Sequence, residues 1–216
     1  MGTLERARLK GLVNMARTLG IIGAGKLGMA VGKAAADGGW NVIFNDVADP
    51  ISVEMMLKNM IPQAKMSTCA GLANQADVVM LALPISQSGK LNYELLDDAI
   101  VLDAMNDWAP EDLEVASGTS ETVAERNPKM HIAKSINHLS YHDYSSDPRP
   151  KGAPDRRAMV VATDFPDAAE VISELVDDMG FDPVVTPFAN NRMLEMGGPI
   201  FGVRLSEAEM REILAT

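Results

Sequence analysis

A glycine-rich turn between an apolar strand and a helix constrains this chain more than any other feature of its sequence. Residues 20–28 read GIIGAGKLG, in which three glycines form the pattern G-x-G-x-x-G. The pattern follows an apolar run at residues 18–22 and opens a segment in which small and apolar residues recur at helical spacing. In that context the first glycine permits a tight turn, the second lets a pyrophosphate approach the backbone, and the third lets helix and strand pack closely. We therefore predict a strand-helix-strand unit whose dinucleotide-binding residues are Gly23, Ala24, Gly25, Lys26, Leu27 and Gly28.

The second strand of this unit is expected at residues 41–45 and ends beside Asp46. An acidic residue about 20 positions after the glycines can accept hydrogen bonds from the ribose hydroxyls of NAD, whereas the 2′-phosphate of NADP would meet carboxylate repulsion. Asp49 adds negative charge, and the segment VADPIS contains no Lys or Arg. Asp46 could instead only cap the turn. We expect NAD(H) to be favoured, with NADP(H) still possible.

Alternation of apolar strands and amphipathic helices from residue 18 to about 185 predicts an α/β fold, a Rossmann-like doubly wound and mostly parallel sheet with a small C-terminal lobe. Residues 1–15 are expected to form a mobile N-terminal extension. The alternative is that the start codon has been placed upstream of Met15. The dinucleotide-binding domain is expected at 16–135, and the lobe that completes the cleft at 136–216. Further strands are expected at 77–83, 99–103, 131–135 and 158–162, and further helices at 91–98, 111–126 and 166–179.

Ligands of such sheets lie at the carboxyl ends of the strands, and two further strand ends qualify as binding positions. One is Ala82, Leu83 and Pro84, and the other is Asn106, just past the strand at 99–103. Asn106 could face the nicotinamide or its ribose, or it could be an ordinary turn residue.

The segment at residues 137–156 is rich in Pro, Ser, Asp and His and has no apolar period. Loops of this length inside a compact protein are often functional, but a surface excursion explains it equally well. His138 and His142 stand four apart, a spacing that suits a metal on a helix. Their Ser- and Pro-rich surroundings disfavour a helix, so we assign no metal site.

The composition of the chain limits the classes of partner that it is expected to bind. The chain of 216 residues carries 30 Asp and Glu against 19 Lys and Arg, a net charge of -11, so we expect no nucleic-acid partner. No apolar run approaches the roughly 20 residues of a membrane span. The single cysteine, Cys69, allows no internal disulfide and fits a reducing compartment, the cytoplasm. We expect the chain to act as a homodimer.

With these residues in view, the chain resembles the coenzyme F420-dependent NADP oxidoreductase family. The resemblance covers residues 17–214 almost throughout. It rests on GIIGAGKLG, MLALP at 80–84, VLDAMNDWAP at 101–110, KSINH at 134–138 and the C-terminal run VDDMGFDPVVTPFANNRMLEMGGPIFG. The resemblance implies a Rossmann domain joined to a small lobe, with a dinucleotide and the deazaflavin coenzyme F420 meeting in the cleft and hydride passing between their rings.

By the same resemblance, Ala82 to Pro84 and the segment 135–138 would line the ring site. That segment contains Asn137 and His138, and Gly197 and Gly198 would approach the deazaflavin side. Direct hydride transfer needs aligned rings more than an acid or a base, and we assign no catalytic residue. Members that use NADP typically carry Ser or Thr and Arg where this chain has Asp46 and Val47, which again favours NAD.

The leading interpretation is an oxidoreductase that transfers hydride between a nicotinamide dinucleotide, NAD before NADP, and a deazaflavin or similar acceptor. The first alternative is a reductase of a small imine or carbonyl compound. Pyrroline-carboxylate-type reductases begin similarly, but they need a helical dimerisation domain for which too little chain follows residue 185. The second alternative is a sensor of redox state that binds the dinucleotide without catalysis.

Overall fold

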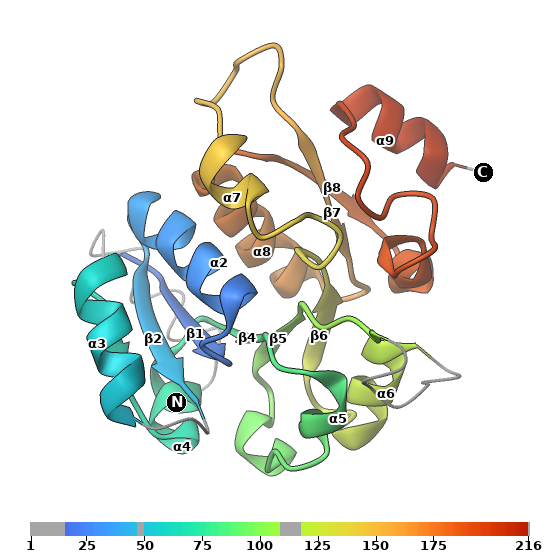
Figure 1. Ribbon diagram of the computed structural model, residues 1–216. Helices are drawn as coiled ribbons and strands as arrows, with labels where there is room; N and C mark the ends of the chain where they lie inside the picture. Colours follow the sequence, from blue (N-terminus) through green and yellow to red (C-terminus); the bar gives the residue numbers. More distant parts are fainter. Residues whose placement is uncertain (1–15, 47–49, 109–117, 216) are drawn as a thin grey trace.

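The computed structural model describes residues 16–46, 50–108 and 118–215, and they form one eight-stranded sheet covered by helices on both faces (Figure 1). The strands are β1 (Thr18–Ile22), β2 (Asn41–Asn45), β3 (Lys65–Met66), β4 (Val78–Leu81), β5 (Ile100–Asp103), β6 (His131–Lys134), β7 (Ala158–Ala162) and β8 (Asp182–Thr186). Their order across the sheet is β3-β2-β1-β4-β5-β6-β7-β8. The expected extension at residues 1–15 lies outside the described residues.

Two layers of helices follow from the alternation of side chains along the strands. Leu19 and Ile21 of β1 point to the face covered by α2 (Lys26–Asp37), α3 (Pro50–Met60) and α8 (Pro166–Asp178). Ile22 faces the opposite layer, where α4 (Cys69–Gln75), the 3-10 helix η1 (Tyr93–Leu96) and α6 (Thr119–Arg126) pack. Each strand therefore contributes to two cores. The remaining helices are α5 (Ile85–Ser88), α7 (Asp143–Ser146), the 3-10 helix η2 (Phe188–Leu194) and α9 (Glu207–Leu214).

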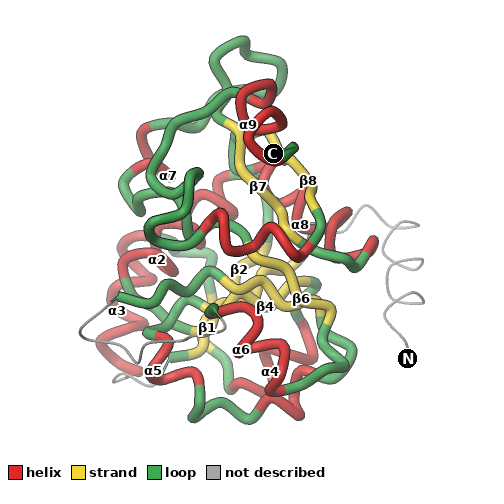
Figure 2. The backbone as a smooth tube through the Cα atoms, turned by 90° about the vertical axis from the view of Figure 1, so that its right-hand side faces the viewer, coloured by secondary structure: helices red, strands yellow, loops and turns green. Residues whose placement is uncertain are grey.

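The sheet is parallel from β3 through β6 and changes direction once. β7 runs antiparallel to β6 through the pair Lys134 and Ala162, and β8 is parallel to β7. Figure 2 shows β7 and β8 at one end of the sheet with α9 beside them. The predicted Rossmann-like, mostly parallel α/β fold is thus confirmed.

The reversal falls close to the predicted boundary at residue 135. Beyond it, β7, β8, η2 and α9 share a core of their own. Met159 and Val161 of β7 nevertheless pack into the core under α2 and α8, so the sheet continues across the boundary. The division into a domain at 16–135 and a lobe at 136–216 stays a prediction.

Most expected strands and helices are present, with changes at their ends. The strand expected at 77–83 ends at Leu81, and the helix expected at 91–98 is only the single turn η1. Of the helix expected at 111–126, residues 119–126 form α6, and positions 111–117 lie outside the described residues. The sequence patterns did not predict α3, β3, α4, α5, α7, β8, η2 or α9.

Hydrogen bonds and ion pairs attach the segment 137–156 to the rest of the fold. Its residues 143–146 form α7, and the Tyr144 hydroxyl donates a hydrogen bond to the Ile136 carbonyl at 2.8 Å. At the other end, the buried Arg156 guanidinium binds the carboxylates of Asp177 and Asp182, both at 2.7 Å. Because both ends are tied to the core, the segment packs as part of the fold.

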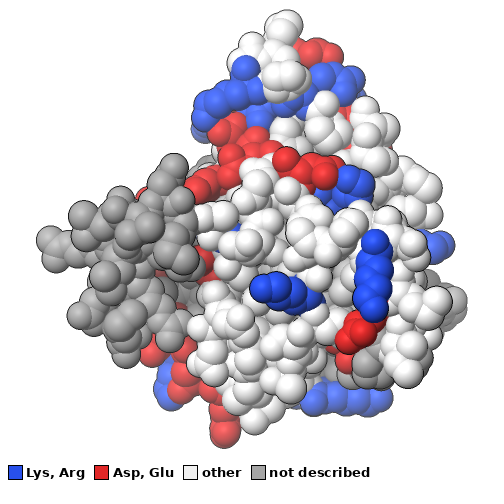
Figure 3. Space-filling view, turned by 90° about the vertical axis from the view of Figure 1, so that its left-hand side faces the viewer, with Lys and Arg blue, Asp and Glu red and all other residues white. Residues whose placement is uncertain are grey.

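Charge is unevenly spread over the surface. Figure 3 shows a broad area with few charged side chains on the side of the molecule where α2 and α3 lie; single basic side chains interrupt it, and acidic side chains gather above it. Large exposed apolar side chains of α3 contribute to the uncharged surface of the protein; they are Ile51, Met55, Met56 and Met60. No helix in the described part of the chain is long and apolar enough to cross a membrane.

Candidate functional site

Two of the motif glycines are required by the close approach of backbone segments. Gly23 ends β1 in a left-handed conformation with φ +114°, and a Cβ atom there would lie 2.3 Å from the Ala82 carbonyl oxygen. A Cβ atom on Gly28 would lie 2.0 Å from the Gly23 carbonyl oxygen. A side chain at either position would push α2 away from the ends of β1 and β4. These glycines therefore hold the turn in its shape.

The third glycine, Gly25, has a different environment. A Cβ atom built on it meets no atom within 4 Å. Gly25 is the N-cap of the 12-residue helix α2, and no side chain caps the helix there. Free N–H groups and the positive end of a helix dipole favour a negative charge at such a position. The open space and the uncapped helix start both fit a pyrophosphate group.

Asp46 lies beside this turn although 22 residues separate it from Ala24. Its carboxylate accepts a hydrogen bond from the Ala24 N–H. The structure thus brings the acidic residue after β2 to the glycine turn. Binding of a ribose by Asp46 stays a prediction. The neighbouring Val47 and Asp49 lie outside the described residues.

A cavity of about 700 Å³ opens at the carboxyl ends of β4, β5 and β6, next to the start of α2. Its size is typical of sites for ring-bearing ligands. It brings together many of the predicted residues, namely Lys26, Leu27, Ala82, Leu83, Pro84, Asn106, Asn137 and His138. Gly197 and Gly198 are not among the described residues that line it, and Phe201 and Gly202 of the same C-terminal segment take that place.

Aromatic side chains in this cavity were missed by the sequence analysis. Trp108 is 49% exposed, and its ring meets that of Phe201 edge to face, with centroids 6.0 Å apart and planes at 69°. The Lys26 ammonium lies 5.5 Å from the centre of the Tyr141 ring. Trp108 stands only two residues beyond Asn106, so a large aromatic residue after a strand end was an available signal. Phe201 and Tyr141 line the cavity although they are far along the chain from β4 and β5, so no local pattern predicts their place.

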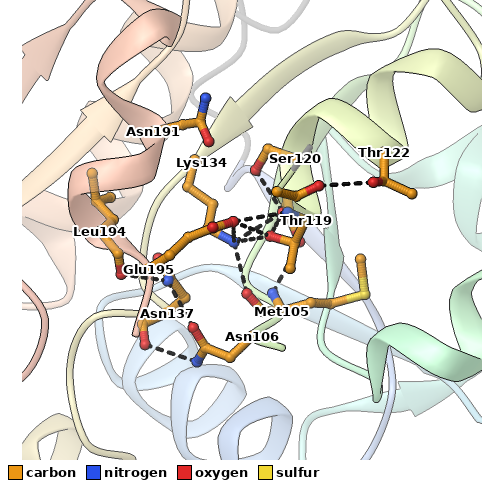
Figure 4. Close-up of polar contacts among 12 residues, drawn as sticks. Met105, Asn106, Thr119, Ser120, Thr122, Lys134, Asn137, Asn191, Leu194 and Glu195 are labelled. Atoms are coloured by element: carbon orange, nitrogen blue, oxygen red, sulfur yellow. Dashed lines mark hydrogen bonds and ion pairs between the residues drawn. The ribbon is translucent and has the colours of Figure 1, made fainter. Parts of the chain in front are cut away.

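Asn106 and Asn137 tie the ends of β5 and β6 together. The Asn106 amide donates to the Asn137 carbonyl at 3.1 Å, and the Asn137 amide donates to Asn106 Oδ1 at 2.9 Å (Figure 4). The Asn137 amide also donates to the Leu194 carbonyl at 2.8 Å, which attaches the C-terminal segment to the same point. Both side chains are buried. Their contact with a nicotinamide ring stays a prediction.

Backbone strain lies next to this pair. Ile136 has φ +73°, and the Asn137 N–H donates to the Ser135 carbonyl at 2.7 Å, which closes a tight three-residue turn. A β-branched residue in this conformation costs on the order of 1–3 kcal/mol and persists only where its surroundings enforce it. Strain of this kind clusters at functional sites.

His138 is a neutral, interior histidine. It is 1% exposed, and burial, with smaller contributions from the Arg157 and Lys134 charges, lowers its pKa to about 3. Its Nε2 accepts a long hydrogen bond of 3.5 Å from the Val160 N–H. His142, by contrast, is exposed. Within the described ranges, no three His, Cys, Asp or Glu side chains come close enough together to hold a metal ion.

We predict that acid weakens the fold partly through His138. In the unfolded chain an imidazole takes up a proton below about pH 6.5, whereas the folded protein keeps His138 neutral down to about pH 3. The stability that depends on neutral His138 is therefore present above pH 6.5 and is lost as the pH falls towards 3. Between about pH 7.5 and about pH 4.5, the loss in the free energy of unfolding should be about 2–3 kcal/mol.

Urea unfolding of wild type and His138→Gln at these two pH values measures the effect. The pH-dependent loss should shrink by that amount in His138→Gln, whereas a His142→Gln control at the exposed position should keep the wild-type dependence. Equal pH dependence in wild type and His138→Gln would contradict the assignment.

Known proteins resemble this chain in the sequence of residues 18–107 and in its fold. Residues 18–107 match the sequence model of the family described as NADP oxidoreductase coenzyme F420-dependent. No curated protein matches the chain in sequence. A hypothetical protein from Sinorhizobium meliloti has a solved structure that is 25% identical, with a TM-score of 0.78, over 92% of this chain and 99% of its own.

More distant structures share the fold. A proposed F420-dependent NADP reductase from Arthrobacter sp. FB24 is 18% identical, with a TM-score of 0.68, over 88% of this chain and 99% of its own. An imine reductase from Myxococcus stipitatus in complex with NAD+ is 13% identical, with a TM-score of 0.56, over 81% of this chain and 56% of its own.

The matched residues contain the glycine turn, Asp46 and the strand ends at Ala82 and Asn106. These are the parts of the structure that fit a dinucleotide, and they lie on a sheet with the expected Rossmann order. Over residues 18–107 the chain is similar to the family described as NADP oxidoreductase coenzyme F420-dependent, whose members are nicotinamide-dependent oxidoreductases.

Proposed function

We propose that this protein transfers hydride between NAD(H) and a deazaflavin of the F420 type in the cavity at the ends of β4, β5 and β6. One observation carries the proposal: the open backbone position at Gly25 is followed directly by Lys26 and Leu27, which line the cavity. A phosphate site and a ring-sized cavity therefore adjoin each other. This is the arrangement that a dinucleotide requires, since its pyrophosphate and its nicotinamide are parts of one molecule.

The position of Asp46 supports NAD over NADP. Its carboxylate lies at the glycine turn, where it accepts the Ala24 N–H. A carboxylate there can accept hydrogen bonds from ribose hydroxyls and repels a 2′-phosphate. The sequence between Asp46 and Ile51 supplies no Lys or Arg that would neutralise such a phosphate.

The residues of the chain bind and orient the reacting rings and keep water away from them. The nicotinamide and the deazaflavin themselves supply the hydride chemistry. Leu27, Leu83 and Met105 give the cavity apolar walls, and Trp108 with Phe201 offers aromatic faces for a second ring. Neutral His138 adds no charge to the lining. Such a cavity suits a reaction that depends on alignment more than on proton transfer.

For the deazaflavin acceptor, we propose that Gly197 and Gly198 shape the entrance of the cavity rather than its wall. Gly197 has φ +87° and open space around its Cβ position, so a ligand can approach its backbone. A homodimer in the cytoplasm also remains part of the proposal. Sedimentation velocity separates a 23.2 kDa monomer from a particle of twice that mass.

The decisive experiment mixes the purified protein with oxidised coenzyme F420 and NADH, or with NADPH, and follows the deazaflavin absorbance. We expect the absorbance to fall with either donor and faster with NADH at low concentration. Oxidation of NADH by a panel of imines and carbonyl compounds, with no change in the deazaflavin, would favour the small-substrate reductase. Tight binding of NADH without turnover of any acceptor would favour the redox sensor.

A further inference from the structure

A fully buried ion pair lies at the ends of β5 and β6, next to residues that line the cavity. Lys134 ends β6 and Asp103 ends β5; both side chains are 0% exposed, and Nζ lies 3.0 Å from Oδ2. Taking two charges out of water is expensive and is compensated only when their hydrogen bonds are satisfied. The three protons of Nζ reach Asp103 Oδ2, the Met105 carbonyl at 2.7 Å and the Thr119 hydroxyl. Figure 4 shows Lys134 close to Met105 and Thr119. The donor capacity of the ammonium is therefore used completely.

The pair holds the backbone of Met105 from both sides. The Met105 N–H donates to Asp103 Oδ1 at 2.9 Å, while its carbonyl accepts from Lys134 Nζ. Met105 and the next residue, Asn106, line the cavity. The ion pair thus fixes the orientation of this segment where it passes from the sheet into the cavity wall.

Two more segments join the same cluster. Ser120, in the first turn of α6, donates to Asp103 Oδ2 at 2.6 Å. Thr119 donates its N–H to Glu195 Oε1 at 2.8 Å, and its hydroxyl lies within donating distance of two carboxylates, Asp103 Oδ2 at 2.9 Å and Glu195 Oε1 at 3.0 Å. Glu195 follows η2 and is followed by the segment that brings Phe201 to the cavity. Residues from β5, β6, α6 and the C-terminal segment therefore meet at one point.

We propose that Asp103, Thr119, Lys134 and Glu195 form a positioning cluster that sets the distance between two cavity walls, 104–108 on one side and 201–202 on the other. The inference rests on the proposed hydride transfer, which depends steeply on how the two rings are aligned. Apolar residues of similar size often stabilise a core as well as a buried ion pair does. What the charged cluster supplies is directional contacts to the Met105 backbone and to Glu195.

The test uses Thr119→Val, which keeps the shape of the side chain and removes the hydroxyl that lies between Lys134, Asp103 and Glu195. We expect kcat for hydride transfer to fall on the order of tenfold. The Kd of NADH should stay within about twofold, since the phosphate contacts at Gly25 are not part of the cluster. Thr119→Ser restores the hydroxyl and should recover most of the lost kcat.

Thr163→Val is the matched control. It removes another buried hydroxyl, which donates to the Ile132 carbonyl at 2.7 Å and lies outside the cavity lining. It should lower the free energy of unfolding about as much as Thr119→Val does while kcat stays at the wild-type value. A wild-type kcat in Thr119→Val, or an equal loss of kcat in Thr163→Val, would overturn the positioning role.

A second readout does not depend on turnover. In a Trp40→Phe background, the fluorescence of the remaining Trp108 reports its contact with Phe201 across the cavity. We expect the emission maximum to move to longer wavelength in Thr119→Val and to stay in place in Thr163→Val. Were the wild-type protein to transfer no hydride, the proposed function would fail, and Trp108 emission would still decide whether the cluster sets the walls. Unchanged emission in Thr119→Val would overturn the cluster proposal by itself.

Discussion

Gly25→Val should bind neither NADH nor NADPH measurably, although its fold stays as stable as that of the wild type. A Cβ atom at residue 25 meets no atom within 4 Å, and the backbone there is extended with φ -72° and ψ -173°, which valine adopts readily. The valine methyl groups would instead occupy the space above the start of α2 that a pyrophosphate needs. We expect affinity to fall on the order of 100-fold or more, about 2.7 kcal/mol.

Fluorescence titration with NADH measures the affinity of each variant, and urea unfolding of the same preparations measures its free energy of unfolding. Gly25→Ala should lie between wild type and Gly25→Val in affinity. Gly28→Ala provides the contrast, because its Cβ would lie 2.0 Å from the Gly23 carbonyl oxygen; it should cost about 1–3 kcal/mol of stability. If Gly25→Val binds NADH as well as wild type does, the turn has only a structural role.

Asp46→Ser combined with Val47→Arg should reverse the choice of dinucleotide. In the wild type, hydrogen bonds from ribose hydroxyls to the Asp46 carboxylate should favour NADH roughly tenfold or more, since a bond to a charged group contributes about 1.5–3 kcal/mol. In the double variant the carboxylate is gone and an arginine can pair with the 2′-phosphate in a bidentate way. The ratio of the two affinities should therefore change on the order of 100-fold.

Paired titrations with NADH and NADPH on both proteins give this ratio directly. Asp46→Asn is the matched control, because an amide keeps an acceptor for the Ala24 N–H and removes only the charge. It should weaken discrimination against NADPH without creating a preference for it. Tighter binding of NADPH than of NADH by the wild type would refute the role of Asp46 and leave NADP as the natural dinucleotide.

Local patterns in the sequence determined the first βαβ unit and the glycine turn within it. The spacing of Gly23, Gly25 and Gly28, the apolar run of β1 and the helical period of α2 all lie within about twenty residues, and each depends on neighbours along the chain. The position of Asp46 beside the turn follows as well, since consecutive parallel strands of such a unit pair with each other. These features were predictable because backbone sterics and side-chain periodicity act over short separations.

Tertiary structure alone decided the buried cluster around Lys134 and the contact of Trp108 with Phe201. Lys134 meets Asp103 across 31 residues, and Thr119 meets Glu195 across 76. No periodicity relates such positions, and a buried lysine looks like a surface lysine in the sequence. The left-handed Ile136 and the antiparallel entry of β7 are likewise consequences of packing that overrides local preference. Long-range burial and hydrogen bonding select these features, and they exist only once the whole sheet has formed.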